Sequence, residues 1–274
     1  MYRIIFRTCD KVHSLHNATR PFGLDKRSLI KLCFISLADA LEGFEHSIHI
    51  IADDISEDLR DFFMQYPVTF TNGTFGNDAS IAISLEQAFS YDDRDWVYLV
   101  EDDYLHSPQA FLWIDDFIKE RERILLTKPK SPLKRLMLAN RKGELHRHPL
   151  FIHTPDYPDR YWPRDRKRSF IFLSKYCHWR QIANTTFTFL AEAKTFKRYR
   201  KQLERGAVGA MDGPMSESIY GRNHFFGKAL CVSPIPGVAT HMHEAVMTPF
   251  VDWKSVAERA EKLQQTTDQT SRVS

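Results

Sequence analysis

The chain has 274 residues, of which 43% are hydrophobic, 13% aromatic and 27% charged. This is the composition of a globular protein with enough apolar side chains for a sizeable core, either in one large domain or in a domain with a small lobe. The formal net charge of +3 gives no indication of a nucleic-acid partner, and no stretch approaches the roughly 20 apolar residues of a membrane-spanning helix.

The first half of the chain alternates between predicted strands and predicted helices. Short apolar runs predict strands at residues 2–6, 47–52, 68–71 and 96–100. Apolar residues at helical spacing predict helices at residues 25–42, after Ser56, from Asn77 or Asp78 to residue 88, and from Pro108 onwards. Gly43 and Ser56 are the expected C-terminal and N-terminal caps of the first two helices. This alternation predicts an α/β fold with a mostly parallel, Rossmann-type central sheet and flanking helices.

The second half is less regular. Six prolines between residues 129 and 163 predict a loop-rich insertion over residues 127–168, with a short strand near 136–138. Further strands are expected at residues 169–173, 185–190 and 229–232, a basic helix at 193–205, and a helix that begins at Asp212 as its N-cap. The basic helix is interpreted as a solvated face, or alternatively as a surface for an anionic acceptor or a membrane. Residues 234–252 are expected to be a loop, and 253–263 an amphipathic helix with a frayed end from 264.

The cysteines and the N-terminus favour a cytoplasmic location. The four cysteines are scattered and include no CxxC pair, which is typical of reduced thiols and not of a disulfide framework or a zinc site. They are Cys9, Cys33, Cys177 and Cys231. Residues near the N-terminus lack the long apolar segment of a signal peptide. We therefore expect a soluble cytoplasmic protein without a membrane span, and the sequence does not indicate its oligomeric state.

Three consecutive acids follow the predicted strand at residues 96–100, namely Glu101, Asp102 and Asp103. A strand that is apolar along its whole length suits the interior of a parallel sheet, and its end lies at the edge where open α/β sheets place their ligands. Three carboxylates crowded at this edge repel one another unless a cation lies among them. Such oxygen ligands suit Mg²⁺ or Mn²⁺, shared with substrate phosphates. The alternative is an exposed acidic turn.

This arrangement resembles the DxD signature of the GT-A glycosyltransferases, with Glu at its first position. Three other features of the chain agree with that resemblance in order and spacing. They are Asp53-Asp54 after the second strand, the segment from Gly76 to Ser80 that leads into a helix, and the late His241. The resemblance covers most of residues 1–125 and, more loosely, residues 170–253. It implies a single domain with a nucleotide-sugar-binding half (1–125), an acceptor-binding half (126–253) and a C-terminal helix and tail (254–274).

The resemblance also implies roles for individual residues around the nucleotide sugar. Asp103 coordinates the metal directly and His241 completes its ligand shell, with His243 as the rival histidine. Glu101 or Asp102 contacts the ribose or a metal-bound water. The remaining donor contacts are expected from residues after the first two strands and from the helix beneath the site; they are Arg7, Thr8, Asp10, Asp53, Asp54 and Asn77.

The catalytic base and the acceptor pocket are assigned in the second half. An inverting transfer needs a base for the acceptor hydroxyl, and the resemblance favours Asp212, with Glu217 as a second candidate. Asp212 is alternatively only a helix cap, and if neither acid is essential a retaining mechanism becomes more attractive. Trp179 and Arg180 are candidates for the acceptor pocket, because an aromatic ring suits a sugar face and a guanidinium suits a carboxylate or phosphate. Alternatively, Trp179 belongs to the core and Arg180 to the surface.

The sequence thus predicts a metal-dependent glycosyltransferase that moves a sugar from a nucleotide diphosphate sugar to a hydroxyl acceptor, a glycan or another molecule, with inversion favoured. A nucleotidyltransferase is a rival, but it is expected to carry a Gly-rich loop after the first strand, and here no Gly occurs before Gly23. A metal-dependent hydrolase built on His241 and His243 is a second rival, although the chain has no HExxH helix. A non-catalytic nucleotide-sugar-binding module is the third.

Overall fold

The computed structural model describes residues 1–11, 19–125, 145–162, 169–209, 211–221 and 229–271. Within these residues one nine-stranded sheet crosses the molecule in the order β3-β2-β1-β4-β9-β6-β10-β8-β7. Its first four strands are parallel, with β1 between β2 and β4. They are β1 (Tyr2–Thr8), β2 (His46–Asp53), β3 (Val68–Gly73) and β4 (Trp96–Glu101). All four therefore end at the same edge, as the alternating sequence pattern predicts.

The other half of the sheet is mixed in direction. β9 (Phe189–Glu192) runs antiparallel to both β4 and β6 (Leu150–Ile152). β10 (Leu230–Ile235) is parallel to β6 and antiparallel to β8 (His178–Ile182), and β7 (Ile171–Leu173) forms the edge. The loop-rich prediction for residues 127–168 is therefore wrong at β6, a fully buried strand inside the sheet. The strand expected at 136–138 lies outside the described residues.

A small two-stranded sheet decides where the late histidine lies. β5 (Tyr104–His106) pairs antiparallel with β11 (Ala239–His241), so that His241 lies opposite Tyr104. The backbone N–H of Met242 extends this pairing by donating to the carbonyl of Asp103 at 2.8 Å. The expectation of a loop throughout residues 234–252 is corrected here, because three residues are too few to give an alternating pattern that the sequence would reveal.

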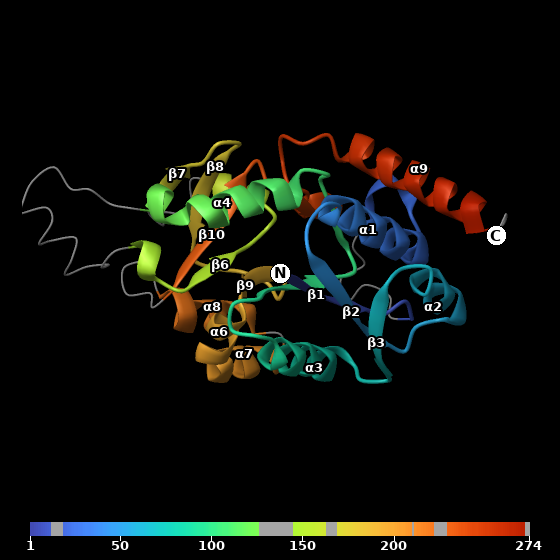
Figure 1. The fold of residues 1–274 in the computed structure, drawn as a ribbon, viewed down its shortest axis with the longest axis horizontal. Helices are drawn as coiled ribbons and strands as arrows, with labels where there is room; N and C mark the ends of the chain where they lie inside the picture. The colour runs from blue at the N-terminus through green and yellow to red at the C-terminus, as the bar shows by residue number, and fades with distance from the viewer. Residues whose placement is uncertain (12–18, 126–144, 163–168, 210, 222–228, 272–274) are drawn as a thin grey trace, which may run out of the picture.

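Helices cover both faces of the large sheet (Figure 1). One face carries α1 (Lys26–Leu41), α4 (Ala110–Leu125) and α9 (Trp253–Ser271), with α2 (Glu57–Phe63) near the β3 edge. The opposite face carries α3 (Asn77–Ser90), α6 (Ala193–Arg198), α7 (Arg200–Ala207) and α8 (Asp212–Tyr220). Short 3₁₀ turns complete the described elements; they are η1 (Pro21–Gly23), η2 (Leu145–Arg147), η3 (Pro158–Tyr161) and η5 (Glu244–Val246). The predicted α/β, Rossmann-type fold class is confirmed.

The two faces of the sheet bury two separate hydrophobic clusters. Beneath α1 and α2, the rings of Phe6, Phe34 and Phe63 meet edge to face with centroids 5.0–5.9 Å apart. Such contacts add about 0.5–1.5 kcal/mol per pair beyond the buried area. On the other face, Phe151 of β6 packs against Phe189 of β9, which stacks on Phe196 of α6. These layers fix the ends of β1 and β4 in a rigid frame.

Several predicted helix ends differ from the structure. The single basic helix is two helices, because Tyr199 between them leaves helical geometry (φ −104°, ψ 18°). The C-terminal helix continues to Ser271 and does not fray at 264. Asp212 is the first residue of α8 and not its N-cap, a position that Met211 occupies without any side-chain cap bond. α3 begins at Asn77 with Gly76 as its N-cap.

Among the described residues, no helix is both long and apolar enough to cross a bilayer.

Candidate functional site

Glu101, the last residue of β4, is held in place by the side chains of Arg7 and Thr188. Its carboxylate forms an ion pair with Arg7 of β1 and accepts a hydrogen bond from the hydroxyl of Thr188 at 3.2 Å. Arg7 also donates to Asn77 and Ser80 of α3, at 3.1 and 3.3 Å. The predicted residues Arg7, Asn77 and Glu101 therefore meet at one point at the C-terminal edge of the parallel strands.

Asp102 lies on the opposite side of the strand end and is fully engaged by the protein. One oxygen accepts from Thr8 Oγ1 at 2.9 Å and from the backbone N–H of Cys9 at 3.0 Å, and the other pairs with Lys26 Nζ at 2.6 Å. Burial acts to lower the pKa of Lys26, but the charges of Asp102 and Asp103 outweigh it and raise that pKa, so the amine stays charged. Asp102 thus fastens the loop after β1 to the start of α1.

Asp103 and His241 form the third pair. Asp103 Oδ2 lies 2.9 Å from His241 Nε2, whereas the buried Oδ1 has no hydrogen-bond partner among the described residues. Burial acts to raise the pKa of Asp103, but the charge and hydrogen bond of His241, with Lys26 and Arg7, lower that pKa to about 2. Burial acts to lower the pKa of His241, yet Asp103 raises it above the ordinary value. Two potential metal ligands are therefore in contact, and one carboxylate oxygen is free.

The same geometry separates His241 from His243. The His241 ring is stacked on the Tyr104 ring, with centroids 5.1 Å apart and an interplanar angle of 7°. His243 instead accepts a hydrogen bond from the backbone N–H of Ala245 and caps η5. Its ring centroid lies 6.0 Å from that of His241. Of the two candidate histidines, His241 is the one that contacts Asp103.

Asp212 reaches the site from α8. Its buried Oδ1 has no hydrogen-bond partner in the part of the chain that the structure describes. Burial raises the pKa of Asp212 to about 6, and the nearby charge of Glu101 adds to this rise while Arg7 opposes it. A carboxylate with a pKa near neutrality is suited to exchange a proton with substrate. Glu217, the second candidate base, is exposed on the same helix.

The residues present fit one kind of divalent-cation site. No group of three or more His, Cys, Asp or Glu side chains in the described ranges is arranged to hold a metal by itself. Asp103 and His241 nevertheless offer a free carboxylate oxygen and an imidazole side by side. Mg²⁺ and similar cations are commonly held by one or two carboxylates together with substrate phosphates. The donor set therefore fits a cation that arrives with a diphosphate, with Asp103 and His241 as its protein ligands.

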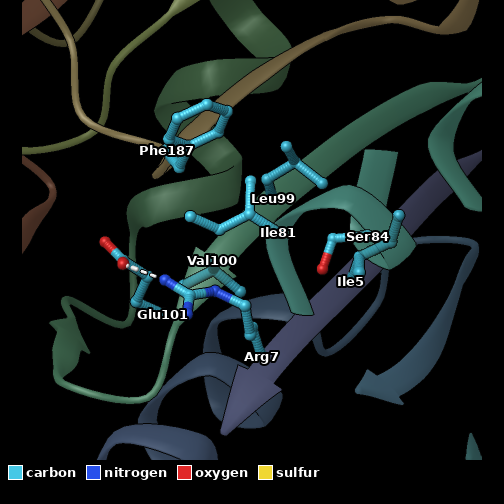
Figure 2. A pocket seen from close by; sticks show the side chains of 8 residues that line it. All are labelled: Ile5, Arg7, Ile81, Ser84, Leu99, Val100, Glu101 and Phe187. Atoms are coloured by element: carbon cyan, nitrogen blue, oxygen red, sulfur yellow. Dashed lines mark hydrogen bonds and ion pairs between the residues drawn. The ribbon is translucent and has the colours of Figure 1, made fainter. Parts of the chain in front are cut away.

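A pocket lies next to Arg7 and Glu101 (Figure 2). Apolar side chains from β1, α3 and β4 and the ring of Phe187 form its walls, and the Arg7–Glu101 ion pair lies at its polar side. The lining residues are Ile5, Arg7, Ile81, Ser84, Leu99, Val100, Glu101 and Phe187. The pocket combines an apolar surface with one cation and one anion, at the edge where Asp212 also lies.

The other acids predicted to contact the donor are engaged in the protein itself. Asp10 accepts from the backbone N–H of Ser56 and from Arg27, both at 3.0 Å. Asp53 accepts from the backbone N–H groups of Phe75 and Gly76, at 2.6 and 3.1 Å. Asp54 is exposed and pairs with Lys11. Asp10 and Asp53 therefore hold the loops beside the site, and neither presents a free buried oxygen.

Neither of the two predicted acceptor residues lines the pocket shown in Figure 2. Trp179 is fully buried in the core, with its ring centroid 4.3 Å from that of Phe117 and its Nε1 donating to Ser174 at 3.1 Å. Its ring consequently has no open face for a sugar. Arg180, on the other face of β8, lies over the ring of Tyr161 at 4.2 Å. The alternative prediction, that Trp179 belongs to the core, agrees with its position in the structure.

Sequence reasoning missed three residues that shape the site. Lys26 neutralises Asp102, Thr188 donates to Glu101, and Tyr104 stacks on His241. Lys26 stood in the first turn of a correctly predicted helix, but nothing local indicates which acid a lysine will meet. Tyr104 directly follows the acidic triplet at the predicted ligand-binding edge, and this position was the one sequence feature that could have identified it as a site residue.

No protein-family model matches the chain, and no curated protein matches it either. Among solved structures, the chain is similar to the galactosyltransferase LgtC in complex with donor and acceptor sugar analogues, with a TM-score of 0.41, 12% identity, and coverage of 84% of this chain and 72% of that chain. It is similar to residues 1–349 of TarS from S. aureus, with a TM-score of 0.43, 12% identity, and coverage of 84% and 57%. It is also similar to 4-diphosphocytidyl-2C-methyl-D-erythritol synthase from Anaerococcus prevotii, with a TM-score of 0.40, 10% identity and 96% coverage of each chain. Likenesses of this size concern the fold and say nothing of activity.

Proposed function

We propose that the chain is a glycosyltransferase that uses a nucleotide diphosphate sugar and a divalent cation, Mn²⁺ or Mg²⁺, and transfers the sugar to a hydroxyl acceptor with inversion. One observation carries this proposal. At the C-terminal edge of the parallel strands, Asp103 beside His241 and Asp212 beside Arg7 and Glu101 each keep a buried carboxylate oxygen without a partner in the described ranges. One acid is thus available to a cation and the other to a proton.

The positive charges at this edge suit a diphosphate. Arg7 and Lys26 each neutralise one acid of the triplet, so that Glu101 and Asp102 do not repel the donor phosphates. Asp103 and His241 would hold the cation, which when bound would supply Lewis-acid stabilisation of the departing nucleoside diphosphate.

Asp212 serves as the general base. Its pKa of about 6 leaves it ionised at neutral pH yet basic enough to accept the proton of an acceptor hydroxyl. Because its Oδ1 is buried and unpartnered among the described side chains, no internal hydrogen bond has to break first. The acceptor oxygen then attacks the sugar from the side opposite the diphosphate, which inverts the configuration at that carbon.

The first experiment is a thermal-shift panel of nucleoside diphosphates and nucleotide sugars, with and without Mn²⁺. A ligand at 100 times its Kd stabilises the native state by about 2.7 kcal/mol, which is readily measured as a rise in Tm. We expect one nucleotide to raise the Tm only with metal, and we expect Asp103→Ala to lose that rise. Asp61→Ala is the matched control, because Asp61 is exposed on α2.

Two outcomes contradict the proposal. If no nucleotide stabilises the protein at near-millimolar concentration with Mn²⁺ present, the edge does not bind a nucleotide diphosphate sugar. If Asp103→Ala keeps the metal-dependent shift of the wild type, the metal assignment is wrong.

A further inference from the structure

A second polar cluster lies at the end of β6, around the buried side chain of Asp156. Arg160 and Arg180 both direct a terminal nitrogen toward Asp156 Oδ1, at 3.9 and 3.7 Å. The side chains of these arginines are only 9% and 13% exposed, and that of Asp156 is 0% exposed. Two guanidinium groups therefore share the one buried carboxylate of Asp156, and the charge of Asp159 also acts on Arg160.

The hydrogen bonds within this cluster are incomplete. Charge-assisted N–H···O⁻ bonds are about 2.7–2.9 Å long, so neither arginine forms one with Asp156. Arg160 uses Nη1 for Pro155 O and Ser233 Oγ, whereas its buried Nη2 has no partner in the described ranges. Both ring nitrogens of the buried His153 lack partners there as well. Buried donors without partners are rare in folded proteins and commonly indicate a missing ligand or water.

This cluster adjoins the transfer site through two tyrosines. The guanidinium of Arg160 lies 5.3 Å from the centroid of the Tyr157 ring. The hydroxyl of Tyr157 is hydrogen-bonded to that of Tyr104, and the Tyr104 ring stacks on His241. Tyr157 and Tyr104 thus lie between the arginine cluster and the proposed metal ligand His241.

Two exposed aromatic rings lie beside the cluster. Tyr161 is 41% exposed, lies over the guanidinium of Arg180 and donates its hydroxyl proton to Asp156. The ring of Phe250, which is 77% exposed, meets Tyr161 edge to face at 5.8 Å. Phe250 also adopts a positive φ of 68°, a strained conformation for an aromatic residue. Aromatic rings beside a guanidinium suit a sugar that carries a negative group.

We propose that Arg160 and Arg180 bind a carboxylate or phosphate group of the hydroxyl acceptor, with Tyr161 and Phe250 as the surface against which the acceptor packs. The identification of the bound molecule as the acceptor rests on the proposed function, whereas the presence of an anion-binding site does not. It defines the acceptor class as anionic: a sugar, polyol or glycan unit with an acidic group close to the hydroxyl that is glycosylated.

The binding test uses small anions and no nucleotide. Thermal shifts are measured at constant ionic strength with sodium phosphate, sodium glucuronate and, as the neutral analogue, glucose. We expect phosphate or glucuronate to raise the Tm and glucose not to, and whichever anion is stronger names the acidic group. Arg180→Gln should weaken that binding about tenfold or more, because a charge-assisted pair is lost. Arg94→Gln, a change at an exposed arginine, should leave it unchanged.

A second variant separates a binding site from a purely structural ion cluster. In Asp156→Asn the internal carboxylate is replaced by a neutral amide, so that both arginines lose their one shared acid. We expect this variant to have a lower Tm than the wild type and to bind the anion several-fold more tightly, since the anion takes the vacated place. The double variant Asp156→Asn/Arg180→Gln should lose this rescue.

The proposal is overturned if neither anion shifts the Tm at tens of millimolar in the wild type and in Asp156→Asn. It is also overturned if Arg7→Gln abolishes the shift while Arg180→Gln keeps it, because the anion then occupies the donor site. These outcomes are distinct from failure of the nucleotide panel, which involves Asp103 and the metal. If a donor is known, transfer to glucuronate should exceed transfer to glucose, and Arg180→Gln should reduce that preference by raising KM.

Discussion

The aspartates at the C-terminal edge of the sheet fall into two regions. On the side of β1 and β2, Asp10 and Asp102 have both oxygens engaged by protein donors, and Asp53 has Oδ1 engaged by two backbone N–H groups. On the side of β5, β11 and α8, Asp103 and Asp212 each keep a buried oxygen without a partner in the described ranges. Aspartates at one edge of a sheet can therefore either hold loops or remain available to a ligand, and their hydrogen-bond partners determine which of the two applies.

This difference has an energetic consequence. An acid that is satisfied by the protein stabilises the folded state, and its loss leaves buried donors or charges unpaired. Asp212 costs stability in the absence of a ligand, because burial raises its pKa and its charge has lost water without full compensation. Asp103 differs, because His241 lowers its pKa to about 2 and so compensates its charge. Substitution of Asp212 and substitution of the engaged acids should therefore move stability in opposite directions.

The largest effect is expected on catalysis at Asp212. Asp212→Asn should reduce sugar transfer by about 10²–10⁴-fold, because a general base is removed, while the metal-dependent Tm shift caused by the nucleotide stays as in the wild type. Release of nucleoside diphosphate in the presence of acceptor measures this. Glu217→Gln is the matched control on the same helix. Wild-type transfer by Asp212→Asn would return Asp212 to a structural role.

The pH dependence of kcat/KM tests the same assignment of Asp212 as the general base. Because the pKa of Asp212 is about 6, kcat/KM should fall about tenfold per pH unit below pH 6, as the base becomes protonated. Asp212→Asn should lose this acidic limb in whatever activity it retains. An acidic limb that stays at the same pH in the variant assigns the titration to another group.

Although Asp212→Asn should impair catalysis, it should stabilise the folded protein at alkaline pH. Its folded-state pKa, about 6, lies above the ordinary value of 3.8, so the folded state binds the proton more tightly than the unfolded chain does. The favourable contribution is present below pH 4 and is lost as the pH rises through 6. At pH 8, Asp212→Asn should therefore increase the free energy of unfolding, by at most about 3 kcal/mol. Urea unfolding at pH 8 measures the change, and a loss of stability contradicts it.

In the other region, Asp102→Asn should destabilise the protein. The charge of the largely buried Lys26 loses its partner, and such losses cost about 3 kcal/mol. In Asp102→Asn/Lys26→Met both charges are absent, so part of that stability should return, and a double-mutant cycle of urea unfolding measures the coupling. Additive effects of the two changes would indicate that the ion pair does not support the fold.

The smallest effects are expected at the neighbouring pair Asp53 and Asp54. Asp53→Ala leaves the N–H groups of Phe75 and Gly76 without their acceptor and should cost about 1–3 kcal/mol. Asp54→Asn affects only an exposed pair with Lys11 and should stay within about 0.5 kcal/mol. Asparagine also tolerates the positive φ of 51° at this position. Equal losses of stability at the two positions would contradict the division of the acids.

The sequence by itself determined the parallel half of the fold. β1, β2 and β4 are apolar runs, and α1 and α3 have apolar residues at helical spacing, so each element shows a pattern within its own few residues. Their alternation implies a parallel sheet, and parallel strands bring Arg7 and Glu101 to one edge because both residues end neighbouring strands. The acids that follow β4 were therefore identified from local patterns and one rule of topology, whereas Asp212 and His241 were identified from the resemblance to the GT-A glycosyltransferases.

Only the tertiary structure decided which acids are free. Asp103 and His241 are 138 residues apart, and they meet through β5 and β11, strands of three residues whose pairing no local pattern predicts. The short central strand β6 was missed for the same reason. A periodic pattern shows that a residue has a buried or exposed face, but it does not name the partner. Whether a carboxylate holds a loop or awaits a ligand depends on that partner.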